Sequence, residues 1–478
     1  MKYYFPYGTH SALTLEIPEQ TSCYFPHSFR HSVPLKKISE LLSRRLNSPL
    51  KYPSLRTCLM EGDRLVIPVA PGIPHVETIL AGILEHLFSE NSLHTDPSDP
   101  LHKHTHHYFR GKIFILRSSE DVNHTGISDE EFRQKIFKKL PKNILEIINS
   151  TFHVPKNDFS DHACHDSACK AHGCSCTSDS DILENSENTA LLTVQTHDPT
   201  QKEQLALLGV RENDEPFIIN RLLFDADFIL PVAEFFPQKR RGYYGSAAAL
   251  YPLFSDKNTQ ERFHNRKNTA FADELHEVIR LLGVTLTLQI LPNIPVFSTS
   301  LLQKKKKNTD SRIADIMVGS LESIWKTGTF RYHQLWRAPA FPKAQIVLAS
   351  ITGGTETQTW ENITHALLNA AKYAEEDALI FLACDISSPA GPAIQAYSRI
   401  QDPNMTIKFL QKKNFPDTIL AKKLIPLLHQ THVYFISPLS EDFLNTLNIS
   451  GLENISDLQR LISHTSSCVF LPDAHRFI

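Results

Sequence analysis

The stretch from Ala344 to Cys384 reads AQIVLASITGGTETQTWENITHALLNAAKYAEEDALIFLAC and indicates the fold class. The apolar run at its start predicts a buried strand over Ala344–Ala349. Apolar residues then recur at helical spacing over Glu361–Ala374, and a second apolar run predicts a strand over Ala378–Cys384. A strand, a helix and a strand in this order are typical of a parallel βαβ unit.

The same alternation extends through the chain on both sides of this stretch. Ser128 and Glu131 form a capping-box pattern that predicts a helix start. Further helices are expected over residues 75–88, 202–208, 268–282, 417–428 and 455–464, and further strands over 65–67, 112–116, 190–195, 224–232, 284–291, 432–436 and 467–471. We therefore predict an α/β protein with two domains of mostly parallel sheet, flanking helices and an interdomain cleft.

The expected domain boundaries follow from breaks in this alternation. Residues 1–290 form the predicted first domain and residues 310–478 the second, because the Lys-rich run Lys304–Lys307 indicates a solvated connection. Two polar segments, at about 89–111 and 157–188, contain too few periodic apolar residues for a packed element. We predict that both are poorly packed surface insertions.

Composition excludes several classes of protein. With 41% hydrophobic and 21% charged residues, the 478-residue chain is typical of globular proteins. A net charge of −3 gives no basic surface for nucleic acid, and no apolar stretch reaches the ~20 residues of a membrane-spanning helix. The chain has neither a phosphate-binding glycine loop nor a nucleophile elbow. We therefore expect no nucleic-acid and no membrane partner.

The cysteines predict a compartment and a candidate metal site. The chain has eight Cys and begins without an apolar leader, which favours the reducing cytoplasm. Thiolate and imidazole side chains at close spacing suit zinc or nickel. They gather in one segment, at His162, Cys164, His165, Cys169, His172, Cys174 and Cys176. The spacing matches no standard zinc finger, so the alternative is a polar tract that binds metal only adventitiously.

A series of motifs has a distinctive order along the chain. His197-Asp198 is followed by Leu208-Gly209, by the stretch GYYGSAAALYP from Gly242 to Pro252, and by His264-Asn265. The segment HTGISDEE begins at His124, and IVLASITGG and WENITHALLNA follow in the second half. Excluding the two insertions, this order resembles the nickel-pincer lactate racemase family over nearly the whole chain.

The resemblance implies a racemase or epimerase of small 2-hydroxy acids. In that family a nickel-pincer mononucleotide takes a hydride from the substrate and returns it, two His residues exchange the hydroxyl proton, and a Lys holds the cofactor covalently. By position, His124 corresponds to one acid–base His and His264 to the nickel ligand. Asn362 and His365 fall on a Gln and a Lys of the second domain, and are the candidate cofactor-binding residues.

Several positions depart from the family pattern. The Lys position is Ala248, whose methyl group cannot form the covalent thioamide. The second acid–base position is Gln238, which cannot exchange a proton near neutral pH. The Asp and Arg of a substrate loop are replaced by Pro68 and Pro71. The resemblance therefore implies a cofactor that is non-covalent if present, and activity that is weakened or altered.

Two functions remain open from the sequence. The first is a divergent 2-hydroxyacid racemase or epimerase with His124 as a catalytic residue and His264 as a metal ligand. The alternative is a non-catalytic small-acid or metal-binding protein on the same fold, with the Cys/His insertion as its main metal site. We interpret His197-Asp198 as a structural pair that holds a turn.

Overall fold

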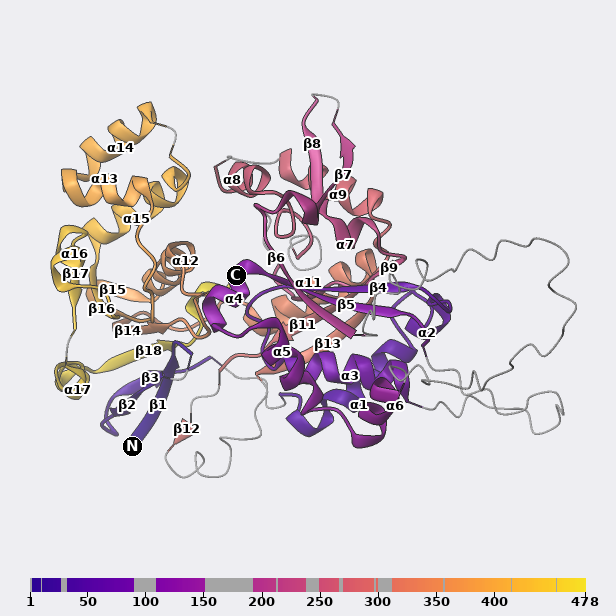
Figure 1. Ribbon diagram of the computed structural model, residues 1–478. Helices are drawn as coiled ribbons and strands as arrows, with labels where there is room; N and C mark the ends of the chain where they lie inside the picture. Colours follow the sequence, from indigo (N-terminus) through magenta and orange to yellow (C-terminus); the bar gives the residue numbers. More distant parts are fainter. Residues whose placement is uncertain are drawn as a thin grey trace, which may run out of the picture.

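The computed structural model describes residues 2–9, 11–26, 32–89, 109–150, 192–211, 214–237, 249–265, 270–295, 298–299, 312–355, 357–413, 415–452 and 454–478. Two lobes, each with a central sheet and helices around it, make up this part of the chain (Figure 1). The predicted fold class, α/β with mostly parallel sheets, is confirmed. Residues 90–108 and 151–191, the greater part of the two predicted insertions, lie outside the described residues, as does the Lys-rich run.

The first sheet has seven strands in the order β13-β11-β10-β4-β5-β6, with β9 also paired to β4. All pairs are parallel except β11 with β13. The central strand β4 is buried on both faces, because Leu65 and Ile67 enter one core and Val66 enters another. The strands are β4 (Arg64–Val69), β5 (Lys112–Ser118), β6 (Leu192–His197), β9 (Phe228–Ile229), β10 (Val232–Glu234), β11 (Leu286–Pro292) and β13 (Ile313–Ser320).

Helices cover both faces of this sheet (Figure 1). On one face pack α1 (Ile38–Asn47), α2 (Leu55–Cys58), α3 (Val76–Phe88), α5 (Asp129–Phe137) and α6 (Lys142–Ser150), with η1 (Leu35–Lys37) before α1. On the other face pack α7 (Arg221–Phe224), α8 (Lys257–Asn265), α9 (Ala270–Leu281) and the hairpin β7 (Leu205–Val210)–β8 (Pro216–Asn220), with η2 (Lys202–Gln204) before it. The short helix α4 (Ser119–Thr125) directly follows β5. The capping box at Ser128 is confirmed at the start of α5.

The second sheet is fully parallel, with six strands in the order β17-β16-β15-β14-β18-β3. These are β3 (Ser22–Tyr24), β14 (Ala344–Ser350), β15 (Ala374–Ala383), β16 (His432–Ile436), β17 (Ile449–Gly451) and β18 (Ser467–Leu471). Around it lie α12 (Trp360–Ala371), α13 (Pro392–Ile400), α14 (Pro403–Lys412), α15 (Thr418–Gln430), α16 (Glu441–Thr446), α17 (Ile455–His464) and η4 (Ala474–Arg476). The apolar faces of α12, α13 and α15 fill one core, while α17 covers the opposite face.

The N-terminal strands pack with the second lobe rather than the first. The hairpin β1 (Lys2–Tyr7)–β2 (Ser11–Glu16) contributes Phe5, Leu13 and Leu15 to the same core as α17, and β3 pairs with β18. A short strand, β12 (Ser298–Thr299), extends this hairpin. Conversely β13, which follows the predicted boundary, belongs to the first sheet. The two sheets therefore do not coincide with the expected domains 1–290 and 310–478. Strand β3 lies in the second sheet and β13 lies in the first.

Helix α11 (Leu321–Trp336) joins the two lobes. Its residues Tyr332 and Trp336 are fully buried in a core that also contains Phe235 after the first sheet's β10 and Val347 of the second sheet. The Trp336 indole donates a hydrogen bond to the Pro292 carbonyl at 3.1 Å. A continuous apolar core therefore links the two halves.

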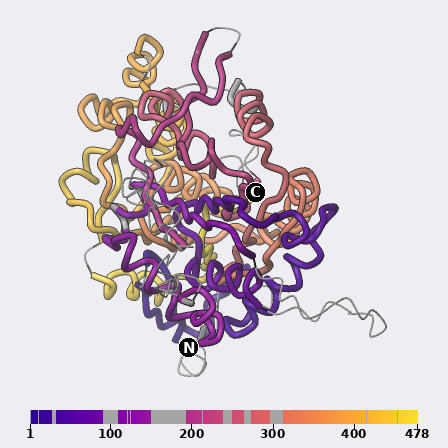
Figure 2. Tube along the Cα trace, turned by 45° about the vertical axis from the view of Figure 1, so that its right-hand side comes forward, coloured from indigo at the N-terminus to yellow at the C-terminus, as the bar shows by residue number. Residues whose placement is uncertain are grey.

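One predicted element is wrong and another is divided. The helix expected over Lys202–Leu208 is a 3-10 turn followed by strand β7, because residues 205–210 pair with β8, with a bulge at Leu208. This hairpin projects from the molecule in both views (Figures 1 and 2). The strand expected over Phe224–Val232 is divided into β9 and β10, with Pro231 between them. Among the described helices, none combines the length and apolar character needed to cross a bilayer.

Candidate functional site

In each of the two sheets the chain adds strands in one direction and then returns to the other side of its starting strand. We call this place in each lobe the reversal point. In the first sheet the chain moves outward from β4 to β5 and β6, then returns to β10 on the other side of β4. In the second it moves from β14 outward to β17, then returns to β18 on the other side of β14. Ligands of open parallel sheets bind outside the carboxyl ends of the strands at such points. The residues that follow β10, β14 and β18 are therefore the candidates for a binding site.

One buried arginine connects these two reversal points. Arg476 of η4 forms a bidentate ion pair with Glu234 at the carboxyl end of β10. Its Nη1 contacts Oε1 of the carboxylate, and its Nη2 donates to Oε2 at 3.2 Å. Its Nε lies 3.7 Å from Asp473, which follows β18. Asp473 in turn accepts hydrogen bonds from the backbone N–H (2.6 Å) and the hydroxyl (2.9 Å) of Thr352, just after β14. The carboxyl ends of the two sheets are thus joined through one charged network.

Titratable groups in this network are strongly perturbed. Tyr332 donates its hydroxyl to the Arg476 carbonyl at 3.0 Å, and burial raises the pKa of this phenol well above its usual value. Burial also holds the pKa of His475 well below its usual value, and the nearby Arg476 and His365 lower it further. His475 is therefore neutral at physiological pH. Perturbed groups at a strand-end junction are typical of functional sites, although structural ion networks also produce them.

The two predicted cofactor-binding residues lie on α12 beside this junction. Asn362 donates its side-chain amide to the Thr357 carbonyl at 2.8 Å, and its backbone N–H is capped by Thr359 at 3.2 Å. Asn362 therefore closes the loop between β14 and α12. His365, one turn further, is half-buried and faces His475 closely enough to affect its pKa. The structure places both residues on the helix that begins at the carboxyl edge of the second sheet.

The backbone of His124 lies at the carboxyl edge of the first sheet, on α4. This helix is held by Arg117 at the end of β5, whose side chain is only 1% exposed. Arg117 pairs with Asp121 at 2.8 Å and Asp129 at 3.3 Å, and its Nη1 donates to the Ile127 carbonyl at 3.1 Å. Residues before, within and after α4 are therefore tied to one buried guanidinium. The side chain of His124 lies outside the described atoms.

A second buried ion cluster fixes α8, which carries His264. Arg262 pairs with Glu215 at 2.8 Å and with Glu274 of α9, whose carboxylate is 1% exposed. Tyr251 donates its hydroxyl to Glu274 at 2.9 Å, and burial, reinforced by this carboxylate, raises the pKa of the phenol. The cluster holds the backbone of α8 against α9. The side chain of His264, like that of His124, is outside the described atoms.

The structural interpretation of His197 is supported by its contacts. Asn220 donates to Nδ1 at 3.0 Å, so Nε2 carries the proton and donates to the Ser255 carbonyl at 2.9 Å. Burial lowers the pKa of this imidazole, which stays neutral. Asp198 instead accepts from Thr200, from the backbone at 2.8 Å and from the hydroxyl at 2.6 Å. His197 thus binds β6 to the start of α8, and Asp198 holds the adjoining turn.

Three polar atoms at the junction are buried without a hydrogen-bond partner among the described residues: Ser350 Oγ, His475 Nδ1 and Arg476 Nε. Ser350 ends β14, the strand at the reversal point of the second sheet, and is fully buried with an unpartnered Oγ. A buried hydroxyl without a partner costs about 1–3 kcal/mol. A hydroxyl or carboxylate ligand that reaches this strand end could satisfy it.

Solved structures share this arrangement of two lobes. A lactate racemase apoprotein from Thermoanaerobacterium thermosaccharolyticum superposes with a TM-score of 0.59, covering 100% of this chain and 99% of that chain at 13% sequence identity. The fold is similar to that of lactate racemase. A structural genomics target from Thermotoga maritima gives a TM-score of 0.51, covering 91% of this chain and 96% of that chain at 11% identity. No protein-family profile and no curated protein sequence matches the chain significantly.

The sequence register predicts that the covalent form of the pincer cofactor does not fit this chain. It assigns Ala248 to the position of the attaching Lys, and a methyl group offers no amine for the bond. In the part of the chain that is described, no group of three or more His, Cys, Asp or Glu side chains gathers where it could hold a metal. The four clustered cysteines Cys164, Cys169, Cys174 and Cys176, together with Gln238 and Ala248, lie outside that part.

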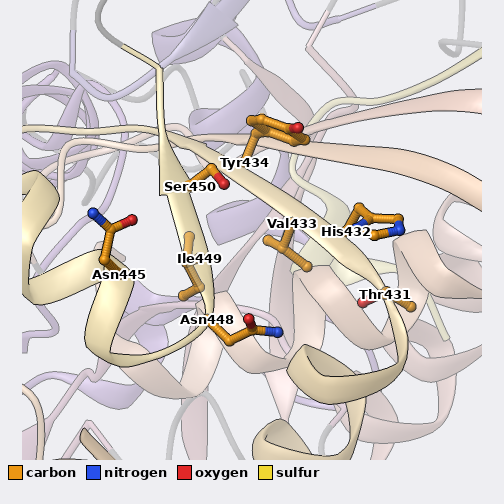
Figure 3. A pocket seen from close by; sticks show the side chains of 8 residues that line it. All are labelled: Thr431, His432, Val433, Tyr434, Asn445, Asn448, Ile449 and Ser450. Carbon is orange, nitrogen blue, oxygen red and sulfur yellow. The ribbon is translucent and has the colours of Figure 1, made fainter.

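A polar pocket lies at the opposite edge of the second sheet (Figure 3). It has a volume of about 140 Å³ and is lined by residues of β16, β17 and the end of α16, among them His432, Asn445 and Ser450. His432 begins β16, so the pocket adjoins the amino ends of the parallel strands. Since ligands of such sheets bind at the carboxyl ends, this pocket is not the candidate site.

The residues that organise the junction were not predicted from the sequence. Glu234 lies far along the chain from Asp473 and Arg476, and none of the three is part of the motifs quoted above. One local signal was available, because Glu234 and Asp473 each follow an apolar strand and strand ends carry the ligands of α/β proteins. Their common partner Arg476 could not be identified without the topology.

Proposed function

We propose that this chain is a divergent lactate racemase-like protein that takes a small 2-hydroxy acid at the carboxyl ends of its two sheets. The observation that carries the proposal is the similarity to lactate racemase apoprotein over the full length of both chains. It is supported by the positions of α4 and α12, which carry His124 and His365 and begin at these carboxyl ends. The proposed location is the cytoplasm.

The proposed chemistry is a weakened or altered racemisation or epimerisation. His124 would exchange the proton of the substrate hydroxyl, and His264 is the proposed ligand of a nickel ion held by a non-covalent cofactor. Because Gln238 stands where the second acid–base His is expected, one direction of proton exchange lacks its base. Loss of one acid–base group costs about 10²–10⁴-fold in rate.

The alternative function is a non-catalytic protein that binds a small acid or a metal. It is favoured by Ala248, which provides no amine to anchor the cofactor covalently. It is also favoured by the Cys and His residues of the insertion at 162–176, which are suitable zinc or nickel ligands. The enzyme and the acid-binding protein both predict acid binding at the junction and differ in turnover, whereas a protein that binds only a metal predicts no acid binding there.

The first experiment measures ligand binding by thermal shift with D-lactate, L-lactate and propionate, which lacks the 2-hydroxyl group. We expect both lactates to raise the melting temperature, and His365→Ala to reduce that shift. His432→Ala is the matched control, because its side chain lies at the opposite edge of the same sheet. Equal shifts with propionate, or an unchanged shift in His365→Ala, would count against the proposed site.

The second experiment separates the enzyme from the binding protein. The protein is produced together with the enzymes that synthesise the pincer cofactor, and interconversion of D- and L-lactate is followed by chiral chromatography. Slow interconversion that is lost in His124→Ala supports the enzyme, and binding without interconversion supports the alternative. Intact mass spectrometry of the same sample is expected to show no cofactor adduct. An adduct on a Lys together with ordinary racemase rates would contradict the divergent assignment.

A further inference from the structure

Two cysteines face each other at the edge of the second sheet. Cys23 on β3 and Cys468 on β18 are directly paired in the parallel register. Cys468 is buried in the apolar core under α17, Cys23 packs against that core, and the two thiols lie close enough to shift each other's pKa. Neighbouring strands are about 4.8 Å apart, which is within the ~4.4–6.8 Å separation of Cα atoms in disulfides. The backbone therefore needs little movement to join the two sulfurs.

We propose that Cys23 and Cys468 form a reversible disulfide that fastens the N-terminal strands to the second sheet when the protein meets an oxidant. The two thiols are not equivalent, since Cys23 is half-buried on the edge strand and Cys468 is fully buried. The hydrogen bond from Cys468 lowers the pKa of Cys23, and the same bond raises the pKa of Cys468. Cys23 is therefore the attacking thiolate and Cys468 the resolving thiol.

The reaction balances with a peroxide as the oxidant. The Cys23 thiolate attacks one peroxide oxygen, the O–O bond breaks, and the leaving hydroxide takes up a proton as water. The sulfur of Cys468 then attacks the sulfenic sulfur of Cys23, an S–S bond forms, and the S–O bond breaks. The released hydroxide combines with the Cys468 proton as a second water. Two thiols are oxidised by two electrons, and the peroxide is reduced.

The bond would add a covalent link to a short strand that is otherwise held by backbone pairing and by the stacking of Phe25 on Phe470. Strand β3 has three residues, and its backbone N–H at Ser22 donates to the Ser466 carbonyl at 2.9 Å. One side-chain hydrogen bond, from Thr21 to the Thr465 carbonyl at 3.2 Å, adds to this pairing. Because the two cysteines are far apart in sequence, a disulfide between them closes a very long loop of the unfolded chain. A clear stabilisation on oxidation follows.

The test uses a variant in which the other six cysteines are replaced, by Cys58→Ser, Cys164→Ser, Cys169→Ser, Cys174→Ser, Cys176→Ser and Cys384→Ala. After treatment with hydrogen peroxide, both free thiols should disappear together and the mass should fall by about 2 Da. Non-reducing peptide mapping should give one peptide pair that joins Cys23 to Cys468. A reductant should restore both thiols, and oxidation should raise the melting temperature by about 5 °C or more.

Single substitutions and a matched pair complete the test. In the same background, Cys468→Ser should leave Cys23 as a sulfenic acid that dimedone traps, while Cys23→Ser should leave Cys468 unmodified. The control keeps only Cys58 and Cys384, which lie in α2 of the first lobe and after β15 of the second, and should give no internal disulfide. Circular dichroism confirms that each variant is folded. Oxidation of Cys23 beyond the sulfenic acid without a Cys23–Cys468 peptide would overturn the proposal.

Discussion

Arg117 shows how much the candidate site depends on single buried charges. Its guanidinium holds both sides of α4, and Arg117→Ala would leave the carboxylates of Asp121 and Asp129 without their buried partner. We expect a loss of about 3 kcal/mol in the free energy of unfolding, measured by urea titration. Arg110→Ala is the matched control, since this side chain is 68% exposed and should change stability by less than about 1 kcal/mol. Equal losses in the two variants would contradict the assigned role.

His86 predicts a pH dependence at the residue scale. Burial, aided by the positive charge of Arg56, lowers the pKa of His86 to about 4. In the unfolded chain the pKa is about 6.5, so between these values the unfolded state binds a proton that the folded state does not. Stability is therefore complete above pH ~6.5 and falls as the pH decreases toward 4, by about 3 kcal/mol in total. In His86→Leu, the loss between pH 7.5 and 4.5 in urea titrations should shrink by about 2 kcal/mol, and an unchanged pH dependence would refute this account.

At the scale of elements, Gly8 fixes the N-terminal hairpin to the carboxyl edge of the second sheet. Its N–H donates to the Ile351 carbonyl at 2.8 Å, its carbonyl accepts from Gly353 at 3.0 Å, and its φ is +56°. A Cβ on Gly8 would fall on the carboxylate of Asp385. Gly126 has φ +64° and open space around it, so an alanine there would meet the same backbone strain without the overlap.

Comparison of these two glycines gives an element-scale prediction. Gly126→Ala should cost about 1 kcal/mol from its left-handed backbone alone. Gly8→Ala should cost more and should also increase hydrogen exchange in the amides of β1 and β2, because the hairpin can no longer lie against Asp385. If Gly8→Ala and Gly126→Ala leave exchange in the hairpin equally unchanged, the hairpin is not held at Gly8.

The elements that the sequence predicted well are those with a strong periodic signal and local boundaries. Helix α17 and strand β18 begin and end where the apolar pattern places them. The error at residues 202–208 arose because a seven-residue pattern cannot distinguish a short helix from a strand, and the pairing of β7 with β8 decided it. Helix and strand can thus be told apart where the periodic pattern extends over many residues. The secondary structure of a short apolar run depends instead on the segments with which it pairs.

At the scale of the whole molecule, the ion pair of Arg476 with Glu234 couples the two lobes. Arg476→Met would leave Glu234 and Asp473 without their shared cation, at a cost of about 3–5 kcal/mol. We expect calorimetry to show the lobes melting in separate transitions in this variant. Arg331→Met, which removes an ion pair to Asp315 within the first lobe, is the control and should not separate them. One unchanged transition in Arg476→Met would mean that the shared apolar core alone couples the lobes.

The candidate site could be only partly predicted at this scale. Motif order placed His124 and His365 on elements that do begin at the carboxyl ends of the sheets. The network of Glu234, Asp473 and Arg476 could not be predicted, because its members meet only after both sheets have formed and the chain has returned across each of them. The same reason explains why β3 and β13 lie in the opposite lobe from the one expected.

The pairing of β3 with β18 also sets an order of events during protein synthesis. Strand β3 leaves the ribosome long before β18 (residues 467–471), which is its only sheet neighbour among the described strands. At roughly 5–20 residues per second, translation separates the two by about 20–90 s. Throughout this interval β3 lacks the strand with which it pairs in the folded protein, and its backbone edge is open to chaperones or to neighbouring nascent chains. Strand β3 is thus made long before it can be paired.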